Sequence, residues 1–122
     1  MILNREQLEI AYNNFLEFLS LKNKAEETAT VKAFEYTYEL SWKLMKKMLR
    51  DSGIDSSSPK DVFRKAAQAE IITNPELWFK FLEMRNITAH TYMDEAITKI
   101  EPILNTFKEE VKKFLNATQA LK

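Results

Sequence analysis

The sequence predicts an all-α fold in a single domain that covers residues 1–122, and three observations lead to this prediction. Only one glycine and three prolines occur, so the chain has few places at which it can turn sharply. The residue types Leu, Lys, Glu, Ala and Met, which favour helices, are frequent. Apolar side chains also recur at the spacing of one helix face in successive segments of the chain.

Composition excludes several kinds of site. Lys plus Arg and Asp plus Glu each number 18, so no overall positive field would hold nucleic acid, and any RNA contact must be local or built by assembly. The absence of cysteine removes disulfides, zinc–thiolate sites and thiol nucleophiles. The start of the chain does not resemble a secretion signal, and no segment has the apolar length of a membrane span. We therefore expect a cytoplasmic protein with no membrane partner.

The first helix should begin at Asn4, whose side chain can cap it, with Gln7 completing an approximate capping box. Its apolar residues fall on one stripe, which predicts packing by a single face. The stripe comprises Leu8, Ala11, Phe15 and Phe18 and is widened by Tyr12, Leu16 and Leu19.

A long second helix should run from Ala25 or Thr30 to Ser52. Gly53, the only glycine, then supplies the left-handed conformation that often ends a helix. Two apolar stripes run along this helix, which predicts a central helix or a subunit contact. One contains Phe34, Tyr38, Trp42, Met45 and Leu49, and the other contains Tyr36, Leu40, Leu44 and Met48.

After a loop over residues 54–58, a third helix should begin with Ser58 as cap and Pro59 in the first turn. Its apolar side is small, so we expect a short helix that docks lightly; this side comprises Val62, Phe63, Ala66, Ala67 and Ala69. Asn74 and Pro75 repeat the start signal for a fourth helix. Its apolar spacing runs through Leu77, Phe81, Met84 and Thr88.

The last helix should start at Asp94 and carry a heptad-like seam suited to a bundle or to another chain. Pro102 interrupts the seam and predicts a kink or break close to Ile100 and Glu101, because proline removes a backbone hydrogen bond. The seam comprises Ile97, Ile100, Leu104, Phe107, Val111, Phe114, Thr118 and Leu121.

The functional candidates lie together in the run Arg85-Asn86-Ile87-Thr88-Ala89-His90-Thr91-Tyr92, which contains the only histidine. Arginine matches phosphate oxygens, and histidine can transfer protons near neutral pH, so the pair suits work on a phosphate ester. On an unbroken helix the two side chains would be about 140° apart. Either the helix ends before His90 and the chain turns back, or Arg85 and His90 of two subunits meet across a symmetric interface.

Cleavage of RNA through its 2′-hydroxyl favours the second geometry. The reaction needs a base for that hydroxyl and an acid for the leaving 5′-oxygen, and one histidine per chain cannot easily be both. A two-fold dimer supplies two histidines, with Arg85 stabilising charge on the phosphorus oxygens. No metal is predicted, because no cluster of His, Asp and Glu surrounds the run.

Structural alternatives need no chemistry. His90 can be a helix C-terminal residue favoured by the dipole, Arg85 a surface ion-pair partner of Glu83 or Glu76, and Tyr92 a half-buried aromatic. The aromatic residues Phe34, Tyr38 and Trp42 then form core or interface, and Lys46, Lys47 and Arg50 form a solvated basic edge.

The run 85–92 resembles the R-x-x-x-x-H-x-Y signature of the HEPN superfamily, including the polar residue after the arginine. Residues 34–43, 58–64 and 77–78 are also similar to the branch called nucleotidyltransferase substrate-binding proteins, which is related to the HepT toxins. The matching segments occur in the same order and cover about residues 30 to 95.

The resemblance implies an up-and-down bundle of about five helices that forms a homodimer and is encoded beside an MNT-type nucleotidyltransferase. HEPN toxins of this kind are metal-independent endoribonucleases, so by position Arg85 and His90 are catalytic and Asn86 is an orienting group. The partner would transfer AMP to Tyr92, and the added anionic group would block the cleft and repel RNA. Lys80 and Lys99 could add positive charge to that cleft.

Two other functions remain open. One is a noncatalytic nucleotide- or substrate-binding subunit of a two-component nucleotidyltransferase, and the other is a purely structural dimer. An adjacent gene with a G-S-x-x-x-x-x-x-S-D-x-D transferase motif would support the ribonuclease and the subunit equally and would exclude the structural dimer.

Overall fold

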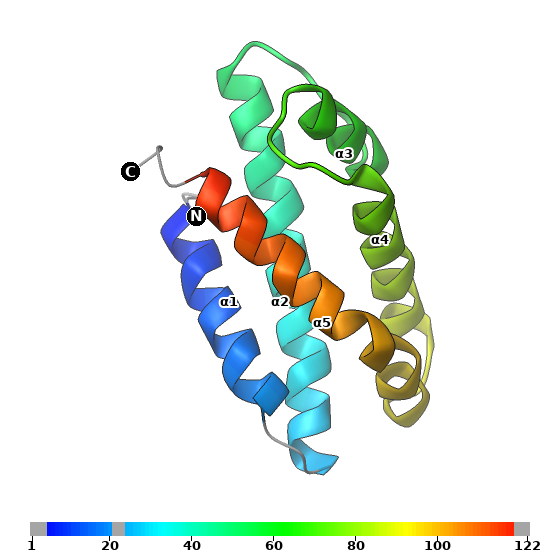
Figure 1. The fold of residues 1–122 in the computed structure, drawn as a ribbon. Coiled ribbons are helices and arrows are strands. Elements are labelled where there is room, and N and C mark those ends of the chain that lie inside the picture. Colours follow the sequence, from blue (N-terminus) through cyan, green and yellow to red (C-terminus); the bar gives the residue numbers. More distant parts are fainter. Residues whose placement is uncertain (1–4, 21–23, 119–122) are drawn as a thin grey trace.

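The computed structural model describes residues 5–20 and 24–118, and within them it confirms the all-α prediction. The elements are α1 (Arg5–Ser20), α2 (Lys24–Asp51), α3 (Pro59–Gln68), α4 (Pro75–His90) and α5 (Met93–Ala117). Four of them form an up-and-down bundle, and the short α3 bridges the same end of α2 and α4 (Figure 1).

Helix α2 is the centre of the bundle, because it contacts each of α1, α3, α4 and α5. Both predicted stripes contribute to the core, although Tyr36 is 55% exposed and Trp42 is only partly buried. The helix ends as predicted: Gly53 has a φ of +82°, and its N–H donates to the Arg50 carbonyl at 2.9 Å. The Ile54 N–H also donates to the Leu49 carbonyl at 2.8 Å. The two hydrogen bonds complete a helix C-cap in which Gly53 has the left-handed conformation.

Phe107 of α5 joins four helices at the middle of the core. Its ring centroid lies 5.4 Å from Phe15 of α1, 4.8 Å from Phe34 of α2 and 5.1 Å from Phe81 of α4. All three pairs are edge-to-face, the arrangement that aromatic rings prefer. The rotation of α4 about its own axis is therefore fixed by large side chains.

Helix α1 packs by one face, as its stripe predicts, and its predicted cap Asn4 lies outside the described residues. Leu8, Ala11, Tyr12 and Phe15 are buried. Arg5 joins this helix to the end of α5, because its Nε donates to the Leu115 carbonyl at 3.3 Å and to Thr118 Oγ1 at 3.1 Å.

Helix α3 begins as predicted, with the Ser58 hydroxyl accepting a hydrogen bond from the Asp61 N–H at 3.3 Å. The expectation that α3 docks lightly is wrong. Val62, Phe63 and Ala66 are each 0% exposed, and the Phe63 ring centroid lies 5.6 Å from that of Trp78. One phenylalanine inserted between α2 and α4 gives this short helix a deep contact.

Helix α5 begins at Met93, one residue before the predicted Asp94, and it is continuous through Pro102. The predicted break does not occur. Pro102 is exposed, so water can satisfy the carbonyl that lacks its usual donor, while buried residues on both sides hold the helix against the core. The seam from Ile97 to Thr118 is buried, and Leu121 lies outside the described residues. No helix in the described part of the chain is long and apolar enough to span a membrane.

Phe63→Ala should lower the free energy of unfolding by about 3–5 kcal/mol, because it removes a fully buried ring and leaves a cavity between α2, α3 and α4. Urea unfolding followed by circular dichroism measures this change. Gln68→Ala, at an exposed position of the same helix, should change stability by less than about 0.5 kcal/mol. Equal effects of the two substitutions would mean that α3 docks lightly after all.

Candidate functional site

The candidate motif occupies the end of α4 and the turn that follows it. Asn74 caps the start of α4 through a 3.4 Å hydrogen bond from the Leu77 N–H, and the helix is continuous through His90. Thr91 and Tyr92 are both extended and lead directly into α5. The predicted geometry in which the helix ends before His90 and the chain turns back toward Arg85 is therefore wrong.

Arg85 faces α2, where it lies between two carboxylates. Its Nη1 is 3.2 Å from Glu35 Oε2, and its Nε is 3.7 Å from Glu39 Oε1. The three side chains are half-buried, with exposed fractions of 29% for Arg85, 24% for Glu35 and 35% for Glu39. Glu35 and Glu39 are one helical turn apart and carry like charges, so the guanidinium offsets a repulsion within α2.

The two carboxylates are themselves oriented by neighbouring side chains. The Thr88 hydroxyl, on the same helix as Arg85, donates to Glu35 Oε2 at 2.7 Å. The Trp42 indole N–H donates to Glu39 Oε2 at 3.2 Å. Each carboxylate thus accepts one side-chain hydrogen bond in addition to its ion pair with Arg85, and the cluster joins α2 to the last two turns of α4.

Tyr38 lies beside this cluster and is 1% exposed. Burial raises the pKa of its phenol, and the Glu39 carboxylate raises it further, whereas the Arg85 charge lowers it. The phenol is therefore neutral at physiological pH. Among the described residues, neither the Tyr38 hydroxyl nor the Arg85 Nε has a hydrogen-bond partner. Arg85 is thus held mainly by charge attraction, since its ion pairs lack good hydrogen-bond geometry.

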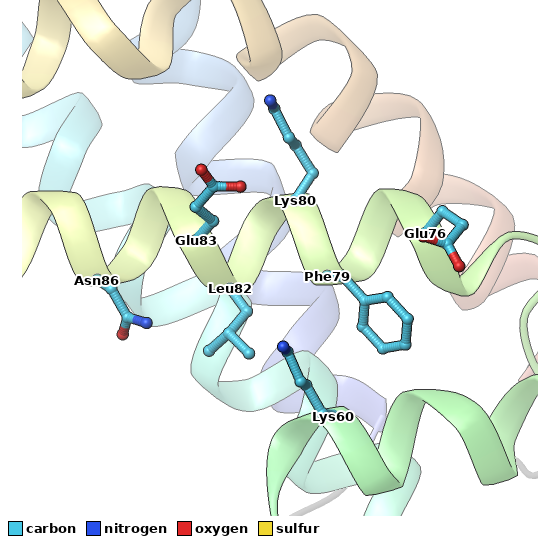
Figure 2. Close-up of a pocket in the computed structure, with 7 residues that line it drawn as sticks. All are labelled: Lys60, Glu76, Phe79, Lys80, Leu82, Glu83 and Asn86. Atoms are coloured by element: carbon cyan, nitrogen blue, oxygen red, sulfur yellow. The ribbon is translucent and has the colours of Figure 1, made fainter.

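Asn86 lies on a different side of α4 from Arg85. Figure 2 shows Asn86, Leu82 and Phe79 extending from one side of α4 toward Lys60 of α3. Asn86 is exposed. His90 comes one turn later, so it continues this outer side of the helix rather than the side that faces α2.

His90 and Tyr92 are both exposed to solvent. With Ala89, Thr91 and Glu95 they surround an open hollow of about 570 Å³ at the junction of α4 and α5. Tyr92 is 87% exposed, so the alternative of a half-buried aromatic is wrong. Its hydroxyl can be reached by another macromolecule without any change in the fold.

The chain by itself does not bring Arg85 and His90 together, because one faces α2 and the other faces outward. Arg85 does form ion pairs, but its partners are Glu35 and Glu39 rather than the Glu83 or Glu76 considered from the sequence. Sequence reasoning missed these two glutamates. Their four-residue spacing beside the aromatic stripe of α2 was the available signal, although nothing in it identified the cation.

No group of three or more His, Asp or Glu side chains in the described part of the chain could hold a metal ion.

The aromatic residues Phe34 and Tyr38 belong to the core, as the structural alternative predicted, and Trp42 is partly buried against it.

Comparison with known proteins identifies relatives over most of the chain. The family described as "Nucleotidyltransferase substrate binding protein like" matches residues 3–120. Probable ribonuclease HepT of Haemophilus influenzae is 33% identical over an alignment of 82 residues, and the match covers 63% of this chain and 56% of that protein. The chain therefore matches only about half the length of this curated relative.

Two solved structures share the fold. One, from Thermus thermophilus, has a TM-score of 0.83 and 26% identity over 92% of this chain and 98% of its own. The other, from Haemophilus influenzae, has a TM-score of 0.81 and 25% identity over 93% of this chain and 98% of its own. The latter was described as revealing the fold of a substrate binding domain of a nucleotidyltransferase.

Glu35→Gln should lower the free energy of unfolding by roughly 1–2 kcal/mol, because it removes a half-buried charge that faces Arg85 and accepts from Thr88. Asp51→Asn is the matched control, since its ion pair with Lys47 is solvent-exposed and should contribute less than about 0.5 kcal/mol. Urea unfolding of both variants at low salt measures the difference. A loss no larger than that of Asp51→Asn would show that the Arg85 cluster does not join α2 to α4.

Proposed function

The chain belongs to the nucleotidyltransferase substrate binding protein-like family, and from this premise we propose that it is a HepT-like toxin of a HEPN/MNT toxin–antitoxin pair. In this proposal it is a metal-independent endoribonuclease with a composite active site across a homodimer. An MNT-type nucleotidyltransferase neutralises it by transferring AMP to Tyr92.

The observation that carries the proposal is the placement of the R-x-x-x-x-H-x-Y residues. His90 and Tyr92 are exposed around one hollow, whereas Arg85 sits on another side of the same helix end. A site that uses Arg85 and His90 together therefore needs a second copy of the chain. This agrees with the chemical argument for two histidines, since one copy supplies only one.

The reaction proceeds by attack of the RNA 2′-oxygen on the adjacent phosphorus. His90 of one copy takes the proton of the 2′-hydroxyl, and His90 of the other copy gives a proton to the 5′-oxygen as the phosphorus–oxygen bond breaks. The products are a 2′,3′-cyclic phosphate and a 5′-hydroxyl. Arg85 stabilises the negative charge that builds on the non-bridging oxygens, and Asn86 orients the phosphate.

Transfer of AMP to Tyr92 stops this reaction by placing an anion beside His90. The phenol oxygen attacks the α-phosphorus of ATP, pyrophosphate leaves, and the phenol proton passes to solvent. The new phosphodiester carries a negative charge two residues from His90, where it repels an RNA phosphate and occupies the hollow. The 87% exposure of Tyr92 supports its role as the acceptor.

The second candidate function is a noncatalytic nucleotide- or substrate-binding subunit of a two-component nucleotidyltransferase. Two observations favour it: the description of the matching family and the zero net charge of the chain, which is unusual for an RNA-cleaving enzyme. Such a protein would bind the transferase or a nucleotide and would cleave no RNA.

Purified wild-type protein should cleave cellular RNA in the presence of a chelator. His90→Ala and Arg85→Ala should each reduce the rate by about 100-fold or more, because they remove proton transfer and charge stabilisation respectively. Arg50→Ala, which changes an exposed arginine at the end of α2, is the matched control and should keep the wild-type rate. Equal cleavage by all variants would indicate a contaminant, and no cleavage by unmodified wild type would favour the binding subunit.

Incubation with ATP and the partner transferase should add AMP to the wild type and to Tyr36→Phe but not to Tyr92→Phe. Tyr36 is the matched control because it is also an exposed tyrosine, at 55%. Intact-protein mass spectrometry followed by peptide mapping detects the added group. AMP found on Tyr92→Phe, or on wild-type peptides that lack Tyr92, would exclude Tyr92 as the acceptor.

A further inference from the structure

A groove lies between the outer side of α4 and the start of α3. Lys60 of α3 forms one wall, and Phe79, Leu82 and Asn86 of α4 line the opposite side (Figure 2). The groove is open to solvent and has a volume of about 460 Å³, enough for a nucleotide-sized group. Only Asn86 among these residues has a part in the function proposed above.

Two cations surround the aromatic ring at one end of this groove. Lys60 Nζ lies 6.0 Å from the centroid of the Phe79 ring, and the guanidinium carbon of Arg64 lies 5.5 Å from it. Phe79 is only partly buried, and Lys60 and Arg64 are exposed. Sites for single-stranded nucleic acid combine a ring that stacks on a base with cations that contact phosphates. Here a base would take the place of the Lys60 and Arg64 side chains over the Phe79 ring, and these cations would turn to the phosphates.

The charges of Lys60 and Arg64 are not neutralised by carboxylates. Within the described ranges neither residue forms an ion pair, whereas Lys43, Lys47 and Lys65 each pair with an acid four residues away on their own helix. Lys60 and Arg64 are themselves four residues apart, so like charges repel along α3. A bound anion would relieve that repulsion.

Two acidic residues, Glu76 and Glu83, also line the groove, and both belong to α4. In Figure 2, Glu83 and Lys80 point to the other side of α4 from Lys60, and Glu76 lies at the end of the groove farthest from Asn86. Lys60 and Arg64 therefore place positive charge on the α3 side of the Phe79 ring, while Glu76 lies on α4 one turn before that ring.

The groove leads toward the candidate catalytic histidine. Asn86 lines the groove, and His90 follows one turn later on the same helix. Phe79 and His90 are separated by about 16 Å along the helix axis, a distance that a few nucleotides can cover. An RNA strand with its scissile phosphate at His90 can thus place neighbouring nucleotides over Phe79.

We propose that the α3–α4 groove binds the nucleotides that flank the scissile phosphate of a single-stranded RNA. Phe79 stacks against a base, and Lys60 and Arg64 contact backbone phosphates. This site rests on the ribonuclease function proposed above and supplies the local positive charge that the neutral composition of the chain lacks.

The test measures RNA affinity separately from cleavage. All variants are made in the His90→Ala background, and a labelled single-stranded RNA of about 12 nucleotides is titrated in chelator with anisotropy as the readout. Lys60→Ala/Arg64→Ala should weaken binding about tenfold and lower the slope of log affinity against log salt by about 1.4, since two phosphate contacts are lost. Phe79→Leu should weaken binding about tenfold with an unchanged slope, because stacking releases no counterions.

Lys108→Ala/Lys112→Ala is the matched control, because it removes two cations at the same spacing from α5 that do not line the groove. It should change affinity less than about twofold. Equal losses for both pairs, or no RNA binding by any variant, would overturn the groove site. Conversion of a dimer to a monomer by Lys60→Ala/Arg64→Ala, seen by sedimentation, would also overturn it, since a second copy would then cover the groove.

The experiments distinguish failure of the proposed groove site from failure of the proposed ribonuclease function. Cleavage by the wild type without a specific loss of binding in Lys60→Ala/Arg64→Ala would overturn the groove alone. A specific loss of binding without wild-type cleavage would support the groove as an RNA site and overturn the ribonuclease.

Discussion

The aromatic contacts of Phe107 set the orientation on which the candidate site depends. Phe81 meets Phe107 at 5.1 Å, so the rotation of α4 is fixed at that point. At 100° per residue, Arg85 then lies only about 40° from Phe81 and faces α2, whereas His90 lies about 180° away and faces outward. The separation of Arg85 from His90 along the continuous helix is therefore a consequence of core packing.

Local sequence signals predicted the ends of most elements, because capping chemistry involves residues close in the chain. Gly53 ends α2, and Ser58 and Asn74 cap α3 and α4 as expected. Contacts between distant segments could not be predicted in this way. The depth of Phe63 depends on Trp78, and the partner of Arg85 is Glu35, fifty residues earlier. Likewise, the effect of Pro102 depended on which side of α5 faces solvent, and burial of Ile100 and Leu104 outweighed the lost hydrogen bond.

The chain has zero net charge, but some of its charged side chains form ion pairs and others do not. Many acids and bases are paired, along a helix as in Lys47 with Asp51, or between helices as in Arg85 with Glu35. The Arg85 pair has a direct consequence for chemistry: two carboxylates keep the guanidinium in place but also reduce its attraction for a phosphate. In the proposed ribonuclease, the RNA must then gain affinity elsewhere. Lys60 lines the groove that leads to Asn86, Arg64 lies over the Phe79 ring of that groove, and neither cation has an acidic partner in the described ranges.

In the proposed inhibition by AMP transfer, the position of Tyr92 would separate control of the site from stability of the fold. Its side chain is 87% exposed in the short connection between α4 and α5, and it makes no capping hydrogen bond to α5. A group attached to its hydroxyl would displace no core side chain, so its effect would be confined to the outer surface around His90. Arg85, by contrast, takes part in a cluster that joins α2 to α4, so covalent modification of its side chain would disturb the packing of these two helices. The proposed inhibitory modification is therefore better placed at Tyr92 than at any side chain of the Arg85 cluster.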